Sequence, residues 1–320
     1  MSCSVHATTR GLFLAQVVSN TMLCEGHYLL RLAVEGLPPS QPGQFVQLQC
    51  RNIAPQVSDT VVEWQPGTLP TLTQPELTHR EPLLRRPISL AGRRAGADGM
   101  PQIDLIYRVA GVGTRWLTDL AGGETLSLMG PLGNAFAIRP DKKFAVCIGG
   151  GVGIPPMIYL AEALAAAGRQ TTAFCGIRSV AMRPFTLMPD VRIPPAPVPA
   201  ACVAEFARHG VAAVIASDDG SLGAKGFVSA AFEQWFQTAA IDPRQLVVYC
   251  CGPEPLMQAV AKTCLQRDIE CQLALERHMA CGIGTCQSCV VKIRDAGEQG
   301  WSYKLCCTDG PVFDARTVLW

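Results

Sequence analysis

Four cysteines near the C-terminus have the spacing of metal ligands. Cys281, Cys286 and Cys289 form a C-x4-C-x2-C run, and Cys307 follows farther along the chain. This is the plant-type spacing for a [2Fe–2S] cluster, in which four thiolates converge on a compact inorganic core. The two glycines inside the run allow the backbone to bend around such a core. The pattern therefore predicts a centre that exchanges electrons one at a time.

Other roles for these cysteines agree less well with the sequence. A structural zinc site usually has two C-x2-C knuckles, and only one occurs here. Disulfides are unexpected, because no secretory signal opens the chain and the 15 cysteines are an odd number. Inert buried thiols are common, and four cysteines in apolar runs fit that description: Cys24, Cys147, Cys175 and Cys264. The spacing does not decide between Cys306 and Cys307, since only one of two adjacent side chains should point inward.

Composition restricts the class of protein. A length of 320 residues accommodates two domains and a small appendage. The net charge of +1 gives no broad basic surface for nucleic acid. Residues 144–161 carry no charge and approach the length of a membrane helix, yet four glycines and two prolines would break it. Because the N-terminus is also unlike a signal peptide, we expect a cytoplasmic protein that binds neither nucleic acid nor membrane.

The chain changes character near residue 143. Before it, short strands are predicted at residues 12–18, 27–34, 44–49 and 103–109, which indicates a small antiparallel barrel. After it, strands at 145–148, 171–175, 211–216 and 246–250 alternate with helices at 154–167, 227–238 and 254–266. This alternation predicts a parallel sheet covered on both faces. Two proline-rich segments, residues 52–81 and 182–199, are interpreted as inserted loops.

A glycine-rich turn opens the second part. Gly149, Gly150, Gly151 and Gly153 follow a predicted buried strand and precede a helix. Glycines there let backbone N–H groups surround a pyrophosphate at the helix N-terminus. The spacing is not a clean dinucleotide-binding fingerprint, and no acidic residue ends the next strand. A tight packing turn is the alternative, but the strand–turn–helix context favours nucleotide binding.

The first part carries a basic motif of its own. In Arg86-Pro87-Ile88-Ser89, the arginine and the hydroxyl are expected to share a strand face and to contact a phosphate and a flavin edge. A solvated basic pair with Arg85 is the alternative, and it would be preferred if the motif stood alone.

Two further turns have modest signals. Gly113 and Thr114 precede a predicted helix at residues 115–120, where an amide and a hydroxyl can meet a phosphate. Cys251-Gly252-Pro253 repeats the strand–turn–helix arrangement after the last predicted strand. Their order along the chain is more informative than either alone.

Taken in that order, the motifs resemble the ferredoxin-reductase-like flavoproteins, and the cysteine run narrows the resemblance to the electron-transfer subunits of NAD-dependent (class 1B) dihydroorotate dehydrogenase. It spans nearly the whole chain except the two insertions. The segments that carry it are LRRPIS at 84–89, YRV at 107–109, GT at 113–114, GPLGN at 130–134, DDGS at 218–221, KGFV at 225–228, MACGIG at 279–284 and CTDGPVF at 307–313.

The resemblance implies a fold and a set of sites. It implies an N-terminal antiparallel FAD-binding β-barrel at residues 1–142, a central parallel-sheet NAD-binding α/β domain at 143–270 and a small [2Fe–2S] subdomain at 271–320. Residues implied for FAD are Arg86, Pro87, Ile88, Ser89, Ile106, Tyr107, Arg108, Gly113 and Thr114. Those implied for NAD are Gly149, Gly150, Gly151, Gly153, Cys251, Gly252 and Pro253. The implied cluster ligands are Cys281, Cys286, Cys289 and Cys307, the last preferred to Cys306 because the family's final ligand lies in a C-x-[DE]-G-P-V-F setting.

The resemblance also implies a partner. Nicotinamide exchanges two electrons as hydride and a cluster exchanges one, so a flavin must stand between them. The implied route runs from dihydroorotate through FMN on a separate catalytic subunit to the cluster, FAD and NAD, in a heterotetramer that serves pyrimidine biosynthesis. Met279 and Ile283 are candidate apolar contacts for that subunit. Asp218 and Asp219 are expected to repel a 2′-phosphate and so favour NAD over NADP.

Two alternative functions remain open from the sequence. The chain could be a subunit of a ferredoxin:NAD(P) reductase or of a sulfide or hydrogen dehydrogenase, although related subunits carry aspartate as the first cluster ligand where this chain has Cys281. It could also be a redox-sensing protein that keeps the fold without turnover, in which case flavin would be absent.

Overall fold

The structure is a computed structural model that describes residues 10–51, 53, 62–63, 65–68, 71–72 and 82–320. The predicted features of the extreme N-terminus and most of the expected insertion at 52–81 lie outside these residues. Within residues 52–81, β4 (Val62–Glu63) pairs with β5 (Thr71–Leu72). No helix of the described residues combines the length and apolar character needed to span a bilayer.

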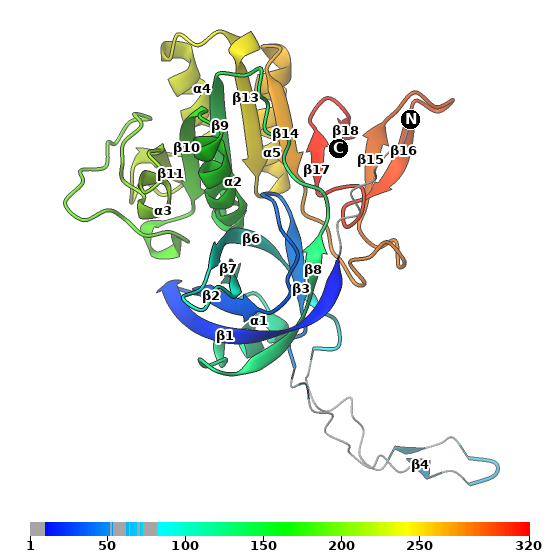
Figure 1. Ribbon diagram of the computed structural model, residues 1–320. Helices are drawn as coiled ribbons and strands as arrows, with labels where there is room; N and C mark the ends of the chain where they lie inside the picture. Colours follow the sequence, from blue (N-terminus) through cyan, green and yellow to red (C-terminus); the bar gives the residue numbers. More distant parts are fainter. Residues whose placement is uncertain (1–9, 52, 54–61, 64, 69–70, 73–81) are drawn as a thin grey trace.

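The predicted barrel is confirmed. Six antiparallel strands close in the order β1-β2-β7-β6-β3-β8 (Figure 1). Their bounds are Gly11–Cys24 for β1, His27–Val34 for β2, Phe45–Leu48 for β3, Arg86–Ala95 for β6, Pro101–Arg108 for β7 and Thr125–Leu132 for β8. Side chains of alternate strand residues, such as Val46, Leu48 and Leu90, fill the interior. Helix α1 (Val112–Thr118) follows β7 and adds Leu117 to that core.

A seven-stranded sheet forms the second layer, in the order β12-β11-β10-β9-β13-β14-β17 (Figure 1). The strands are β9 (Phe144–Gly150), β10 (Gln170–Ile177), β11 (Ala212–Ser217), β12 (Ala224–Lys225), β13 (Leu246–Cys251), β14 (Glu270–Ala274) and β17 (Val312–Asp314). All are parallel except β17, which pairs antiparallel with β14. Strand β14 crosses the position after residue 270 where the boundary between the NAD-binding domain and the cluster subdomain was expected. That boundary stays a prediction.

Helices cover both faces of the sheet, as predicted. Their bounds are Ile154–Ala166 for α2, Ala204–Ala207 for α3, Val228–Thr238 for α4 and Glu254–Gln266 for α5. In β9, Ala145 and Cys147 pack on the α2 side, whereas Val146 and Ile148 pack on the α4 and α5 side. Short 3-10 turns are η2 (Gly151–Gly153), η3 (Val180–Met182) and η4 (Pro243–Gln245). The expected loop at 182–199 contains neither helix nor strand after η3, apart from a bridge between Leu187 and Val203.

The C-terminal residues form a small sheet of their own. Strands β15 (Val290–Arg294), β16 (Trp301–Leu305) and β18 (Val318–Leu319) lie in the order β16-β15-β18 beside β17 (Figure 1). Cys289 and Cys307 belong to the same apolar core as Phe45 and Leu132 of the barrel and Val248 of the central sheet. One core therefore joins all three parts.

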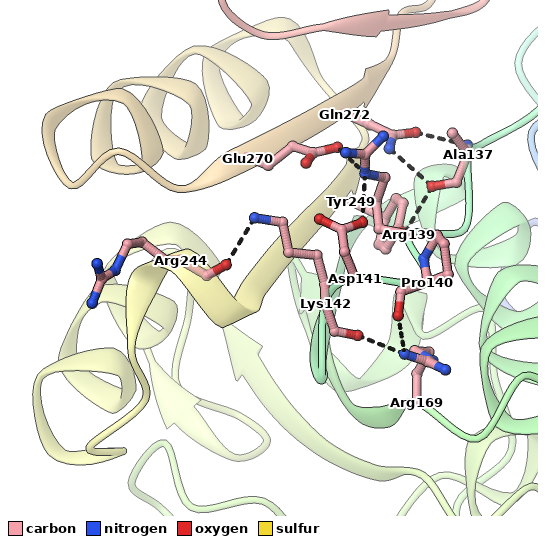
Figure 2. A network of polar contacts seen from close by, with 10 residues as sticks. All are labelled: Ala137, Arg139, Pro140, Asp141, Lys142, Arg169, Arg244, Tyr249, Glu270 and Gln272. Atoms are coloured by element: carbon pink, nitrogen blue, oxygen red, sulfur yellow. Dashed lines mark hydrogen bonds and ion pairs between the residues drawn. The ribbon is translucent and has the colours of Figure 1, made fainter.

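Polar contacts fix the segment that connects barrel and sheet (Figure 2). Gln272 Nε2 donates to the Ala137 carbonyl at 3.0 Å, and Gln272 Oε1 accepts from the Ala137 N–H at 2.9 Å. The Tyr249 hydroxyl donates to the same carbonyl at 3.0 Å. Arg139 forms an ion pair with Glu270 at 3.1 Å. These contacts hold the connecting segment directly against β13 and β14.

Candidate cofactor sites

The four cysteines expected as ligands lie together in two pairs. The thiols of Cys281 and Cys286 are within hydrogen-bonding range of each other, and so are those of Cys289 and Cys307. The two pairs are neighbours, since Cys281 also interacts with Cys307. Among the described residues, no three His, Cys, Asp or Glu side chains converge closely enough to bind a single metal ion. Two adjacent pairs match the donor set of a cluster with two irons, each bound by two thiolates.

The loop that carries three of these cysteines directs N–H groups at sulfur. The N–H groups of Ile283 and Cys286 both donate to Cys281 Sγ at 3.4 Å. Gly282 and Gly284 have φ values of +72° and +90°, a region that favours glycine and lets the loop turn back on itself. Hydrogen bonds to sulfur are what stabilise and tune such clusters. The loop therefore fits an iron–sulfur cluster on its own geometry.

The thiols of the loop differ in acidity. A hydrogen bond from the Ser288 hydroxyl, followed by backbone hydrogen bonds, lowers the pKa of exposed Cys286 to about 6. The two sulfur atoms of the adjacent cysteines Cys306 and Cys307 lie in different places. Cys306 Sγ donates to the Leu275 carbonyl at 3.8 Å inside the core, and burial raises its pKa to about 12. The thiol of Cys307, not that of Cys306, is the one within hydrogen-bonding range of the Cys289 thiol.

The cluster loop contacts the barrel at a residue that the sequence reasoning missed. Gly282 is buried against the side chain of Gln47 on β3. Gln47 is fully buried, and neither Nε2 nor Oε1 has a hydrogen-bond partner. A glutamine in a strand usually marks the solvent side, so the sequence pattern carried no signal for this position.

Arg86 lies across the start of α1. A Cβ at Gly113 would be 2.7 Å from Arg86 Nε, so the guanidinium occupies the space in front of this glycine. The Thr114 hydroxyl accepts from the N–H groups of Ala110 and Gly111 at 2.8 Å and 3.1 Å. Thr114 thus shapes the turn, and the guanidinium and the turn's backbone converge as an anion-binding region requires.

The strand residues expected for FAD divide between the two sides of the barrel wall. Ile88 and Tyr107 belong to the barrel core. Ile106 packs instead with α2 and the central sheet, and by alternation Arg108 shares its outer side. Arg86 and Ser89 are three residues apart on β6, so they do not share a strand face as expected, and Arg86 reaches the site from the strand end.

Arg85 has a structural role. Its guanidinium donates to the carbonyl and the hydroxyl of Ser127 at 3.0 Å and 2.8 Å, and to Gln49 Oε1 at 3.2 Å. These bonds tie β6 to β8 and to the end of β3. The two adjacent arginines therefore point to different places, and only Arg86 faces α1.

The two turns expected to face NAD are in backbone contact. Gly149 is paired with Cys251 across β9 and β13. A Cβ at Gly153 would overlap the Cys251 carbonyl and lie 2.6 Å from the Gly252 nitrogen. A Cβ at Gly150 would lie 3.1 Å from Pro253 Cδ. Both turns lie at the carboxyl ends of parallel strands, where nucleotides bind in such sheets.

Two carboxylates lie on the same edge of the sheet. Asp218 and Asp219 follow β11 and are exposed. Asp219 Oδ1 accepts from the Ser221 N–H at 2.9 Å, and hydrogen bonds from Ser221 lower the pKa of Asp219. Asp219 is therefore fully ionised at neutral pH.

The residues expected to contact a partner differ in exposure. Ile283 is 43% exposed on the cluster loop, whereas Met279 is partly buried against the core. Val290 and Tyr303, 39% and 65% exposed, lie beside this loop on β15 and β16. Val290 and Lys292 share a face, and Lys292 pairs with Tyr303. Ile283, Val290 and Tyr303 are thus exposed apolar side chains, among the described residues, on or beside the cysteine loop.

Solved structures share this fold. The NADH-dependent reduced ferredoxin-NADP oxidoreductase aligns with a TM-score of 0.67 at 22% identity, over 96% of this chain and 90% of that chain. The ferredoxin reductase in carbazole 1,9a-dioxygenase aligns with a TM-score of 0.54 at 20% identity, over 82% and 68%. The architecture is therefore that of the ferredoxin reductases.

Sequence relatives are more specific. Residues 276–319 match the family model of the iron-sulfur cluster binding domain of dihydroorotate dehydrogenase B. The dihydroorotate dehydrogenase B (NAD(+)) electron transfer subunit of Listeria monocytogenes serotype 4a is 33% identical over 306 residues, 95% of this chain and 97% of that protein. The corresponding subunit of Geobacillus thermodenitrificans is 32% identical over 308 residues, 95% and 96%. That of Desulforamulus reducens is 35% identical over 246 residues, 75% and 82%. The chain therefore belongs to the family of dihydroorotate dehydrogenase B (NAD(+)) electron transfer subunits.

Proposed function

We propose that this chain carries electrons between a dihydroorotate dehydrogenase catalytic subunit and NAD, as the electron transfer subunit of that enzyme in pyrimidine biosynthesis. When bound, a [2Fe–2S] cluster supplies one-electron transfer and FAD converts between single electrons and the hydride pair of NAD. The observation that carries the proposal is the contact between Gly282 of the cluster loop and Gln47 on the barrel strand next to β6. This contact supports the proposal, because it would bring the two proposed cofactor regions side by side.

Residues of the chain have separate tasks in this scheme. Cys281, Cys286, Cys289 and Cys307 would bind iron as thiolates, and the loop N–H groups that already point at sulfur would stabilise the negative charge there. Cys306 remains a core residue. The described cysteines are all free thiols, which suits a reducing compartment, so we place the protein in the cytoplasm.

The barrel would hold FAD from its outer side. Arg86 would bind a phosphate together with the turn at Gly113 and Thr114. Pro87, Ser89, Ile106 and Arg108 would line the ring and its chain, while Ile88 and Tyr107 support them from the barrel core. Tyr107 is held there by stacking on Tyr28, with ring centroids 5.5 Å apart.

The turns at Gly149–Gly153 and Cys251–Pro253 would bind NAD from the edge of the sheet. The ionised Asp219 and its neighbour Asp218 would repel a 2′-phosphate, because like charges on this edge are unfavourable. Comparable turnover with NADPH and NADH would contradict this coenzyme preference.

The FMN-containing catalytic subunit would cover the cluster loop, and a heterotetramer is the assembly we expect. A ferredoxin:NAD(P) reductase or a sulfide or hydrogen dehydrogenase is a weaker alternative, because Cys281 stands where related subunits carry aspartate.

The proposal is tested by measuring NADH-dependent dye reduction and dihydroorotate oxidation separately, with and without the catalytic subunit. Protein made under anaerobic, iron-replete conditions without its partner should contain iron, sulfide and FAD and should reduce artificial dyes with NADH. It should not oxidise dihydroorotate until the catalytic subunit is added. Oxidation of dihydroorotate by this chain alone would contradict the division of labour, and a protein with cluster but without FAD would instead support a redox sensor.

A further inference from the structure

Gln47 has the least satisfied side chain among the buried residues that the structure describes. It is fully buried, and both Nε2 and Oε1 lack a partner. A buried polar atom without a hydrogen bond costs about 1–3 kcal/mol. The other buried glutamines are paired: Gln44 donates to the Gly133 carbonyl at 3.0 Å, and Gln272 bonds to Ala137. The carboxamide of Gln47 therefore requires an explanation.

The residues directly opposite Gln47 on the neighbouring strands give its carboxamide nothing to bond. In β3, Gln47 pairs with Pro87 of β6 on one side and Met129 of β8 on the other. Directly opposed residues project on the same face of a sheet. Neither side chain carries an N–H or O–H group, so neither satisfies the carboxamide.

The only other contact described for the Gln47 carboxamide is the cluster loop. A Cβ at Gly282 would lie 2.9 Å from Gln47 Cδ and would overlap Nε2. Gly282 has a φ of +72° and directly follows Cys281. The amide nitrogen is thus aimed at the backbone next to the first expected iron ligand, and only glycine leaves room for it.

We propose that Gln47 is a positioning residue for the iron–sulfur cluster, and that its Nε2 donates a hydrogen bond to a cluster sulfur on the Cys281 side. This inference rests on the proposed function. Cysteine binds iron as a thiolate, and thiolate and sulfide sulfurs only accept hydrogen bonds, so they match the donor that lacks a partner. A donor on this side stabilises the extra negative charge of the reduced cluster and raises its reduction potential.

The inference is tested with Gln47→Met, which keeps the length of the side chain and removes both polar atoms. Iron, sulfide and FAD contents should equal those of the wild type. The equilibrium constant for cluster reduction should fall roughly tenfold, which lowers the potential by about 59 mV for one electron, and the electron paramagnetic resonance spectrum of the reduced cluster should change. Without cofactors, the variant should be at least as resistant to heat as the wild type, since the unpaired amide is gone.

Gln272→Met is the matched control. It removes a buried carboxamide that is already paired with Ala137. Its thermal stability should fall while the cluster potential and spectrum stay unchanged. If Gln47→Met likewise lost thermal stability while the cluster potential and spectrum stayed unchanged, Gln47 would have a role in folding alone. That result would overturn the proposal.

A measurement on the unaltered side chain covers the case in which Gln47→Met fails to retain its cluster. Protein labelled with 15N at the glutamine side-chain nitrogen should show, by pulsed electron paramagnetic resonance, a coupling between the reduced cluster and that nitrogen. The coupling should persist after Gln287→Ser, which removes the glutamine inside the cysteine run. Its absence, or an unchanged potential in Gln47→Met, overturns the role of Gln47. A wild-type protein without iron would instead overturn the proposed function.

Discussion

Gly113 and Arg86 are in direct contact at the start of α1, with Arg86 Nε 2.7 Å from the position that a Cβ on Gly113 would occupy. Gly113→Ala should therefore displace the guanidinium and weaken FAD binding roughly tenfold, or about 1.4 kcal/mol. Flavin content after purification and titration of the apoprotein with FAD measure this. Gly111→Ala is the control, because nothing lies within 4 Å of a Cβ there. Equal FAD affinities in the two variants would show that Arg86 does not bind the FAD phosphate.

Cys307→Ser and Cys306→Ser should have different effects. Cys307 meets Cys289, so Cys307→Ser should lose most of its iron and sulfide and the spectrum of the reduced cluster. Cys306 Sγ donates to the Leu275 carbonyl in the core, and serine is a slightly smaller side chain of the same shape. Cys306→Ser should therefore retain the cluster and lose only ~1 kcal/mol of stability, as a buried substitution does. If Cys306→Ser loses its iron and Cys307→Ser does not, Cys306 is the cluster ligand and Cys307 is the core residue.

Gly153→Ala should separate the two turns expected to bind NAD. The added Cβ overlaps the Cys251 carbonyl and lies 2.6 Å from the Gly252 nitrogen, and backbone atoms cannot move aside cheaply. The KM for NADH in dye reduction should rise roughly tenfold or more, while FAD content stays constant. Val152→Ala, at an exposed position in the same turn, should leave the KM unchanged. An unchanged KM in Gly153→Ala would argue that NAD binds elsewhere.

Alkylation of the metal-free protein should depend on pH in a defined way. The pKa of Cys286 is lowered to about 6, so its thiolate fraction rises as the pH passes through that value. Iodoacetamide labelling of the Cys286 peptide should reach half of its plateau rate near that pH, as mass spectrometry can follow. Ser288→Ala removes the largest cause and should shift the profile upward. Burial raises the pKa of Cys147, so this thiol should react only after unfolding. A half-plateau above pH 8 in the wild type would contradict the Ser288 contact.

Ile283→Glu should weaken binding of the catalytic subunit. Ile283 is 43% exposed on the cluster loop, and burying a new carboxylate in an interface is costly. We expect roughly tenfold weaker association, or about 1.4 kcal/mol, by calorimetry or co-purification, with NADH-dependent dye reduction intact. Phe227→Glu is the control, since Phe227 is 72% exposed at the start of α4. Equal loss in both variants would indicate a general effect of charge.

Local sequence signals predicted the regular elements well. Strand β2 and helix α5 have the predicted bounds. The apolar periodicity and the end signals that predict such elements depend only on residues close together in the sequence. The pairing of β14 with β17 was not predictable, since 37 residues separate Ala274 from Val312 and only the folded chain brings them together.

The candidate sites show the same division. Spacing identified the cysteine run but left Cys306 and Cys307 open. The resemblance favoured Cys307, and the turn after β16 sends the Cys306 thiol into the core instead. Motif order pointed to Arg86, yet its path around the strand end to Gly113 is a tertiary contact. Gln47 was missed for the same reason, because its significance depends on Gly282, more than 200 residues away.

The pairing of Leu48 with Arg86 brackets residues 49–85, which include the expected insertion. The residues on either side of it close the barrel in unbroken register, so extra chain enters and leaves at one point of the wall. The entropic cost of a longer excursion grows only logarithmically. This junction is consequently a place where evolution, or a protein engineer, can graft a whole module onto the flavin barrel without redesigning it.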